Sequence, residues 1–390
     1  ILLIQLCMSI SMEYHEQIST LFEILIMNTL VPNEASIQTA FNTIFDIIGE
    51  GRFGKIYRIK PEYSDEFTDN LAFKISYGYR TGNDEMMMHN YLFKMPNGYP
   101  EYILKPYSGL LIQKPRDGEQ VIRQYKFDEH YGDSSFEYKS LNQYSVDDDY
   151  YMMLFAMPLG DGEDDIEGLY LMDQYNIDMT FYNNVARYLL DFMSEYNVYL
   201  LDIKLKNMVL IGGQIKFIDL DFICKVKDNI DDKDVKRSAK NYYRSLPDCN
   251  ALKCATDCGR WSYMAPEMRK KEWDFNPDTT LTWNIGYMVY TDLQVIYKRC
   301  DKILTKKGTL YPTYKDKNYM RNIQILLDPD MAILCGNNEM KQKLIHQKQA
   351  LLALIVPLPD KDDETWENGE IYTNWEPNMR QPLSLLIDAP

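Results

Sequence analysis

The sequence predicts an α+β protein, in which a β-rich N-terminal part precedes a mostly helical C-terminal part. Short runs of β-forming residues recur between about residues 41 and 114, separated by turn-forming and charged residues. Beyond Gly160, apolar residues recur at helical spacing instead, most clearly over residues 179–197. The change of period therefore divides the chain into two parts of different architecture.

The size and charge of the chain limit the class of protein. Its 390 residues can bury a sizeable core, and 45% hydrophobic with 26% charged residues is typical of a globular protein. The formal net charge of −16 would repel nucleic acid and anionic membranes and would favour basic proteins as partners. No apolar run reaches the ~20 residues that span a bilayer. We expect a soluble, intracellular protein with no nucleic-acid partner and no membrane span, whose oligomeric state stays open.

Cysteine and histidine give little sign of a metal cluster. The seven cysteines show no short disulfide framework, which favours a reducing compartment. Cys249, Cys254 and Cys258 lie close together, but their spacing is not that of a zinc ribbon. With only four histidines in the chain, a histidine-based triad or metal cluster is also disfavoured.

The pattern of the chain predicts three segments. Residues 1–40 form a helical extension, in which residues 12–30 are predicted as an amphipathic helix. Residues 41–157 form the β-rich part, where a polar, acidic, tyrosine-rich stretch at about 115–149 is an insertion or a long hairpin. Residues 158–390 form the helical part.

A glycine-rich stretch, IIGEGRFGKIYRIK, places Gly49, Gly51 and Gly54 in G-x-G-x-x-G spacing. In a dinucleotide-binding unit the last glycine opens a helix, whereas here β-forming residues continue on both sides. Such a hairpin lies over nucleotide phosphates, because glycines let backbone N–H groups approach the anion. Phe53 at the tip would shield that site from water. The alternative is an ordinary β-hairpin with no ligand.

A lysine in an apolar strand and a following helix extend this hypothesis. Lys74 lies within LAFKI, where it is either an exposed edge residue or a lysine that reaches the α- and β-phosphates. A lysine in the second role needs a carboxylate to hold it, and Glu85 of NDEMMMHNYLF is the candidate. Asn83 or Asp84 is predicted as the N-cap of that helix.

Motifs spread along the chain resemble those of the eukaryotic-type protein kinases in order and rough spacing. They cover residues 42–387 and are GEGRFGKIY, LAFK, DIKLKN, IDLD, YMAPE and EPNMRQPLSLLI. The resemblance implies a bilobal fold, with a small antiparallel β-sheet and one main helix in the N-lobe, residues 41–157. Residues 158–390 would be the larger, mostly helical C-lobe. It also implies ATP and Mg²⁺ as cofactors and a protein hydroxyl as the acceptor.

The resemblance assigns catalytic roles to Asp202 and Lys204, beside Lys74 and Glu85, and metal-binding roles to two further residues. Asp202 matches the catalytic aspartate, which orients the substrate hydroxyl and accepts its proton. Lys204 matches the lysine that stabilises the charge of the transferring phosphoryl group, and this lysine is typical of Ser/Thr kinases. Asn207 and Asp219 match the two positions that bind Mg²⁺ through oxygen.

The resemblance also assigns nucleotide-binding positions. The side chains of Ile56, Ala72 and Val209 would enclose the adenine. The hinge at 157–159 would bond the purine through its backbone, and Asp161 or Glu163 would meet the ribose. Glu267 and Arg380 would form an ion pair that braces the C-lobe. The nucleotide-binding set is Gly49, Gly51, Phe53, Gly54, Ile56, Ala72, Lys74, Met157, Leu159 and Val209.

Departures from the family pattern fall on supporting positions. Leu200 and Leu201 replace His-Arg, so the basic pocket for an activation-loop phosphate is missing beside Asp202, and activity would not depend on that phosphate. The activation segment, 219–267, is long and is expected to be a mobile or docking loop. The other departures are Asp221 for glycine, Arg260 for threonine and Leu281 for aspartate.

Two functions stay open. An active Ser/Thr kinase is favoured, because the charged and polar residues that would touch ATP, metal and nucleophile are all present. The alternative is a pseudokinase, a nucleotide-binding or scaffold module on the same fold, which the departures favour. A small-molecule kinase is disfavoured by YMAPE and the full glycine hairpin. The abundance of Ile, Asn, Asp and Tyr favours an AT-rich genome and a viral protein, as in a large DNA virus.

Overall fold

The chain divides into two compact units. The first, here the N-terminal unit, contains Ile1–Asp164, Val209–Asp221 and Asp232–Tyr242, and the C-terminal unit contains Asp165–Met208, Phe222–Asp231 and Tyr243–Pro390. Within them the computed structural model describes residues 14–30, 35–51, 54–61, 71–77, 81–114, 120–127, 150–171, 174–175, 177, 179–200, 202–220, 223–226, 237–246, 278–285 and 288.

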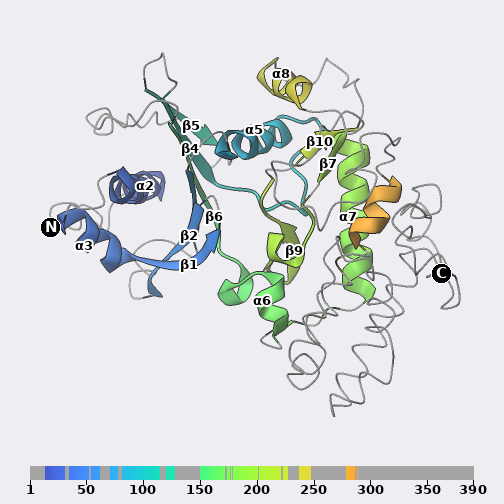
Figure 1. The fold of residues 1–390 in the computed structure, drawn as a ribbon, viewed down its shortest axis with the longest axis horizontal. Helices are drawn as coiled ribbons and strands as arrows, with labels where there is room; N and C mark the ends of the chain where they lie inside the picture. Colours follow the sequence, from blue (N-terminus) through green and yellow to red (C-terminus); the bar gives the residue numbers. More distant parts are fainter. Residues whose placement is uncertain are drawn as a thin grey trace, which may run out of the picture. The chain divides into compact units, whose positions relative to one another are not determined.

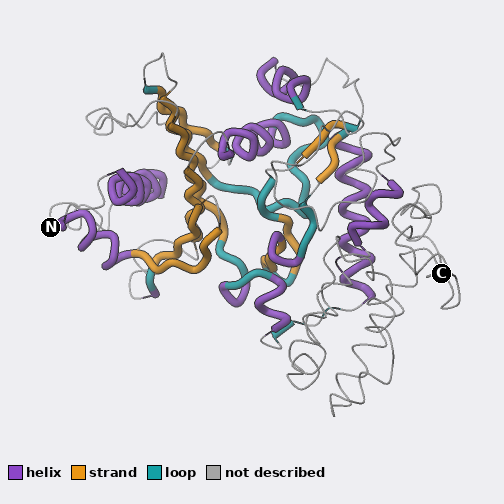
Figure 2. Tube along the Cα trace, in the orientation of Figure 1, coloured by secondary structure: helices purple, strands orange, loops and turns teal. Residues whose placement is uncertain are grey.

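A six-stranded antiparallel sheet forms the centre of the N-terminal unit (Figures 1 and 2). Its strand order is β1-β2-β3-β6-β4-β5. Together with several helices, the sheet makes this a mixed α+β protein, as the sequence predicts. The strands are β1 (Phe45–Gly51), β2 (Gly54–Ile59), β3 (Leu71–Tyr77), β4 (Ser108–Lys114), β5 (Val121–Lys126) and β6 (Tyr150–Pro158).

Two N-terminal helices cover one face of this sheet. They are α2 (Tyr14–Leu30) and α3 (Ala35–Ile44), and the apolar stripe of α2 is buried in one core with β3. The Phe22 and Phe73 rings meet edge to face at 6.0 Å between centroids. Full burial of a Leu or Phe side chain stabilises by about 1.5–3 kcal/mol, so this core gives the sheet a rigid backing.

The other face of the sheet packs against α5 (Thr81–Phe93), and Figure 1 shows α2 and α5 on opposite sides of the strands. Met86 of α5 shares a core with Leu111, Met153 and Phe155. Because side chains alternate along a strand, β3 directs Phe73 toward the α2 core and Lys74 toward the α5 face. The sheet is therefore a layer between helices, and its α5 face carries the polar chemistry.

Some boundaries differ from those expected from the sequence. The β-type pattern was expected from about Phe41, but α3 continues to Ile44, because both residues pack into the α2 core. Within the expected insertion at 115–149, Val121–Lys126 is the edge strand β5 and pairs with β4 in a hairpin. Gln120 and Phe127, on either side of this strand, are also described, whereas residues 115–119 and 128–149 lie outside the described residues.

Helices and short strands form the C-terminal unit. They include α6 (Ile166–Leu171), α7 (Met179–Tyr196), β7 (Val198–Leu200), the 3-10 turn η3 (Leu205–Asn207) and β10 (Ile223–Lys225). The apolar face of α7 buries Val185, Leu189 and Phe192. Asn197 follows α7 with a φ of 55°, the left-handed conformation that commonly ends a helix. Strand β7 then pairs with β10, where Cys224 is buried and disulfide-bonded.

A small β-hairpin follows η3 in the sequence. Its strands are β8 (Met208–Ile211) and β9 (Gln214–Phe217), connected by Gly212 and Gly213 with φ of 58° and 75°. Positive φ at both positions is the geometry of a tight hairpin turn that glycine favours. The remaining described elements are the 3-10 turn η2 (Asp161–Glu163), α8 (Arg237–Ser245) and a helical stretch at 278–285.

Among the helices in the described part of the chain, none is both long enough and apolar enough to cross a bilayer.

Candidate functional site

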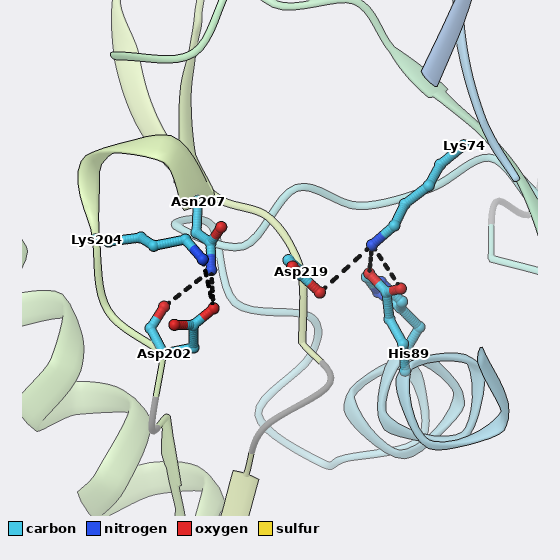
Figure 3. Close-up of polar contacts among 7 residues, drawn as sticks. Lys74, His89, Asp202, Lys204, Asn207 and Asp219 are labelled. Atoms are coloured by element: carbon cyan, nitrogen blue, oxygen red, sulfur yellow. Dashed lines mark hydrogen bonds and ion pairs between the residues drawn. The ribbon is translucent and has the colours of Figure 1, made fainter. Parts of the chain in front are cut away.

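Lys74 and Glu85 form a buried ion pair in the N-terminal unit. The Lys74 Nζ donates to both Glu85 carboxylate oxygens, at 2.8 and 2.7 Å (Figure 3). Glu85 is only 2% exposed, so its charge depends on this partner. Gly109 of β4 allows α5 to approach, because a Cβ there would lie 2.7 Å from Met86 Cε. The sheet and α5 therefore bring the two residues together as the sequence predicts.

The N-cap prediction for α5 was wrong. Helix α5 begins at Thr81, so Asn83 and Asp84 lie inside its first turn and not before it.

Asp219 approaches the same lysine from a third segment. Its Oδ1 lies 3.5 Å from Lys74 Nζ as an ion pair, and among the described residues this buried oxygen has no hydrogen-bond partner. Strand β9 positions Asp219, because the Phe217 amide and carbonyl bond the backbone of Tyr102 and Leu104. Asp219 has a φ of 66°, an unusual conformation for a residue with a side chain and one that is common at functional sites.

Electrostatics keep Glu85 ionised in this cluster. Burial alone would raise the pKa of Glu85, but the Lys74 charge and the His89 contact outweigh it and lower the pKa to about 2. Burial lowers the pKa of His89 below its ordinary value of 6.5, and Lys74 adds to this effect, while Glu85 opposes it. The cluster at neutral pH therefore combines a carboxylate, an ammonium and a neutral imidazole.

A second cluster forms within one short loop of the C-terminal unit. Asp202 Oδ2 accepts hydrogen bonds from Lys204 Nζ at 2.9 Å and from Asn207 Nδ2 at 2.7 Å (Figure 3). Asn207 Nδ2 also donates to the Asp202 carbonyl at 2.9 Å. Ile203 and Leu205 are 2% and 3% exposed, so the apolar side chains anchor the loop while the polar ones meet each other. Lys204 and Asn207 thus both donate to the Asp202 carboxylate, while their predicted roles toward a phosphoryl group and Mg²⁺ stay predictions.

The glycine hairpin is present where the sequence places it. Gly49 and Gly51 lie on β1, and Gly51 pairs with Gly54 of β2 next to the turn. A Cβ on Gly54 would lie 1.9 Å from the Ile75 carbonyl oxygen, so the close approach of β2 to β3 requires glycine there. Gly49 has more room, because its Cβ would lie 3.5 Å from Ile56. Phe53 lies outside the described residues.

Residues predicted to enclose the adenine share a face of the sheet with Lys74. Ile56 pairs directly with Lys74, and Ala72 pairs with Met157 two positions along β3. Directly paired residues and residues two apart point to the same face, so these side chains gather on the α5 side. Val209 of β8 lies close to Gly160, since a Cβ added to that glycine would be 3.3 Å from Val209 Cβ. Leu159 directly follows the last residue of β6.

Asp161 has a different partner from the ribose that the sequence suggested. Its carboxylate accepts hydrogen bonds from the Gly212 and Gly213 amides at 3.2 and 2.7 Å. Asp161 therefore fastens η2 to the β8–β9 turn, and both oxygens already have acceptor roles. The alternative, Glu163, belongs to η2, and its side chain is not described.

Several supporting positions from the sequence interpretation lie outside the described residues: Leu201, Asp221, Arg260, Glu267 and Arg380. Leu281 is described and fully buried. Near it, a hydrogen bond that the sequence did not indicate joins Tyr199 Oη to Asn284 Oδ1 at 2.9 Å. Both side chains are 1% exposed, so the bond is fully buried. This bond attaches β7 to the stretch at 278–285, and its donor, Tyr199, lies three positions before Asp202 in the sequence.

His89 was also missed. It lies one helical turn after Glu85, and the i, i+4 spacing was the only sequence signal for it.

No group of three or more His, Cys, Asp or Glu side chains suited to a metal occurs in the described ranges.

Comparison with protein-family models and with curated proteins finds no match for this chain.

Proposed function

We propose that the chain is a Ser/Thr protein kinase, which transfers the γ-phosphoryl group of ATP to a protein hydroxyl. The observation that supports this most is the convergence of Lys74, Glu85 and Asp219 from β3, α5 and the segment after β9. The kinase resemblance assigns these three residues to one nucleotide site. We further propose a bilobal kinase fold, with residues 41–157 as the N-lobe and residues 158–390 as the C-lobe.

In this proposal the N-terminal unit holds the nucleotide. Glu85 orients Lys74 Nζ so that it can donate to the α- and β-phosphates, and the glycines let backbone N–H groups approach the phosphate oxygens. The apolar surface that includes Ile56, Ala72 and Val209 would contact the adenine. Since Asp161 bonds the Gly212–Gly213 turn, we do not assign it to the ribose.

The C-terminal unit would supply the proton acceptor. As the γ-phosphorus bonds the substrate oxygen, its bond to the ADP oxygen breaks, and the hydroxyl proton passes to the Asp202 carboxylate. Lys204 lies next to this carboxylate and would donate to the transferring phosphoryl oxygens. The bonds from Asn207 hold Asp202 in one orientation, so the acceptor is positioned before the substrate arrives.

The kinase resemblance assigns Mg²⁺ to Asp219 and Asn207, and each would offer one side-chain oxygen. The buried Asp219 Oδ1 has no hydrogen-bond partner among the described residues, and a carboxylate oxygen is a preferred Mg²⁺ ligand. Asn207 uses its Nδ2 on Asp202, so its amide oxygen is the remaining acceptor. When bound, Mg²⁺ neutralises charge on the phosphate oxygens.

A nucleotide-binding scaffold without transfer is the alternative function. It is favoured by Leu200 and Leu281, which are buried at 6% and 0% exposure where the kinase resemblance implies polar side chains.

A phosphoryl-transfer assay tests the proposal. The native chain is incubated with Mg·[γ-³²P]ATP and a basic protein rich in serine and threonine, and the phosphoamino acids are then identified. We expect phosphoserine or phosphothreonine from the native chain and background transfer from Asp202→Asn. Asp191→Asn, on α7 of the same unit, is a matched control that should keep transfer within about twofold of native. If native and Asp202→Asn give equal background transfer while both bind Mg·ATP, the scaffold alternative replaces the kinase.

A further inference from the structure

His89 is a buried imidazole whose two ring nitrogens both face polar groups. It lies on α5 and is 5% exposed. Its Nδ1 is 2.5 Å from the Tyr99 hydroxyl oxygen, and its Nε2 is 3.9 Å from Glu85 Oε1. Figure 3 shows the imidazole beside the carboxylate that holds Lys74. His89 therefore connects Tyr99 to the Lys74–Glu85 pair.

Aromatic rings hold the imidazole in place. The Phe155 ring meets it edge-on with centroids 4.9 Å apart, and the Phe127 ring lies at 5.9 Å. The Tyr99 ring is parallel to it within 2°. Among the described residues, the charged groups around it include Glu85 on α5, Lys74 on β3 and Lys105, whose Nζ is 6.0 Å from the Tyr99 ring centroid. Asp219 lies one step farther, with its Oδ1 3.5 Å from Lys74 Nζ. Such packing leaves the imidazole few orientations.

The contacts select one tautomer of the neutral imidazole. Neutral histidine has one N–H donor and one bare nitrogen acceptor. If the Tyr99 hydroxyl donates to Nδ1, then Nε2 carries the proton and presents an N–H to the Glu85 carboxylate. In the other tautomer a lone pair would face that carboxylate, which is unfavourable. The competing acceptor for the hydroxyl, the Leu104 carbonyl oxygen, is farther away at 3.4 Å.

We propose that His89, oriented by the Tyr99 hydroxyl, is a positioning residue that holds Glu85 against Lys74. The imidazole Nε2 lies 3.9 Å from Glu85 Oε1, the same oxygen that accepts from Lys74 Nζ at 2.8 Å, so two side chains restrain the carboxylate. Without the Tyr99 hydroxyl the imidazole can change tautomer and present its lone pair to Glu85. The carboxylate then turns, and the Lys74 amine is held less firmly. Any effect on phosphoryl transfer rests on the proposed function, whereas the positioning of Lys74 does not.

The test measures the reactivity of Lys74 and needs no ATP. The full-length chain is treated with an N-hydroxysuccinimide acetate reagent, and the acetylation rate of Lys74 is followed by mass spectrometry. Lys206, whose side chain is 60% exposed, serves as the internal reference. An amine paired with a carboxylate acetylates slowly, so Glu85→Gln defines the rate of a Lys74 that has lost Glu85 and keeps its ion pair with Asp219. Loss of one hydrogen bond predicts that Tyr99→Phe raises the Lys74 rate by about two- to tenfold.

Matched variants distinguish the positioning of Glu85 by His89 from a general loss of packing around α5. Tyr125→Phe removes another hydroxyl that contacts α5, at Met87, and should leave the Lys74 rate at its native value. His89→Leu should raise the rate, and Tyr99→Phe should add nothing further in the His89→Leu background, because the hydroxyl acts through the imidazole. If kinase activity is present, Tyr99→Phe should lower kcat/KM while Tyr125→Phe does not.

Two results would overturn the inference. One is a native Lys74 rate in folded Tyr99→Phe protein, and the other is an equal Tyr99→Phe effect with and without His89. Because acetylation of Lys74 is independent of catalysis, absence of phosphoryl transfer would count against the proposed function alone.

Discussion

The two polar clusters are assembled in opposite ways. The Lys74 cluster draws on β3, α5 and the segment after β9, so it exists only when the sheet and α5 have packed. The Asp202 cluster lies within one loop, and its most distant partners are five positions apart. Both bury their carboxylates, since the Glu85 and Asp202 side chains are 2% and 5% exposed. The comparison shows that similar burial can depend on tertiary packing in one region and on local backbone geometry in another.

The largest expected effect is a difference in the free energy of unfolding between variants of Lys74 and of Lys204. Lys74→Met removes the ammonium from a fully buried carboxylate and should lower the free energy of unfolding by about 3–5 kcal/mol. Lys204→Met is the matched variant, and it should cost about 1 kcal/mol, because Asp202 retains both bonds from Asn207. Urea denaturation followed by circular dichroism measures both. Equal losses would show that the clusters do not differ in their dependence on the fold.

A pair of glycine variants tests how strictly the sheet sets the Lys74 cluster. Gly54→Ala would place a Cβ 1.9 Å from the Ile75 backbone oxygen, so β2 must move away from β3. We expect a loss of about 1–3 kcal/mol, as for an overpacked core. Gly49→Ala, on the partner strand, has a 3.5 Å contact and should leave the melting temperature nearly unchanged. A similar shift for both variants would contradict this difference.

In the C-terminal unit, the Tyr199–Asn284 bond offers a smaller and more local test. Tyr199→Phe leaves the buried Asn284 oxygen without its donor and should cost about 1–2 kcal/mol. Replacing both partners, as in Tyr199→Phe with Asn284→Leu, should restore much of that loss, because no polar atom is then left unpaired. Thermal melting of the single and double variants decides this. Additive losses would mean that the two side chains act independently.

The smallest expected effect is a pH dependence that comes from the Lys74 cluster. Burial lowers the folded pKa of His89 below 6.5, so the unfolded chain takes up that proton first as the pH falls. Stability is therefore lost as the pH drops from 6.5 toward the folded pKa. The folded pKa of Glu85 is lowered from 4.5 to about 2, so a second loss occurs between those values.

His89→Leu is the control for the first part of this profile. The variant should remove the change in unfolding free energy just below pH 6.5 and keep the acid loss from Glu85. The charged neighbours that could modify the profile are Glu85, Lys74 and Lys105. An unchanged profile near pH 6.5 in His89→Leu would assign the pH dependence to another group.

The features predicted correctly from the sequence are those that a few consecutive residues encode. The apolar run LAFKI predicted a strand around Lys74, and DIKLKN contained the polar residues of the Asp202 loop within a few consecutive positions. The glycine spacing predicted the hairpin, since a close approach or a tight turn restricts the residue type. The pairing of Lys74 with Glu85 could be proposed only because the kinase resemblance supplied the long-range contact.

Contacts between distant elements were not predictable in the same way. Tyr99 reaches His89 from a loop after α5, and Asn284 reaches Tyr199 from far along the chain, so neither pair has a sequence period. Asp161 or Glu163 was predicted to meet a ribose, and nothing in the sequence indicated that the amides of the β8–β9 turn donate to the Asp161 carboxylate. Likewise, α3 continues past Phe41 because burial against α2 outweighs the β propensity of its last residues.

The central claim is that the Lys74 cluster holds the nucleotide and Asp202 enables transfer. Calorimetric Mg·ATP binding and single-turnover transfer, measured on the same native, Lys74→Met and Asp202→Asn proteins, test it most directly. We predict that Asp202→Asn binds Mg·ATP with a Kd within about threefold of native but transfers at background, since its side chain keeps its shape. Lys74→Met should lose binding. Transfer by Asp202→Asn at the native rate would contradict the claim.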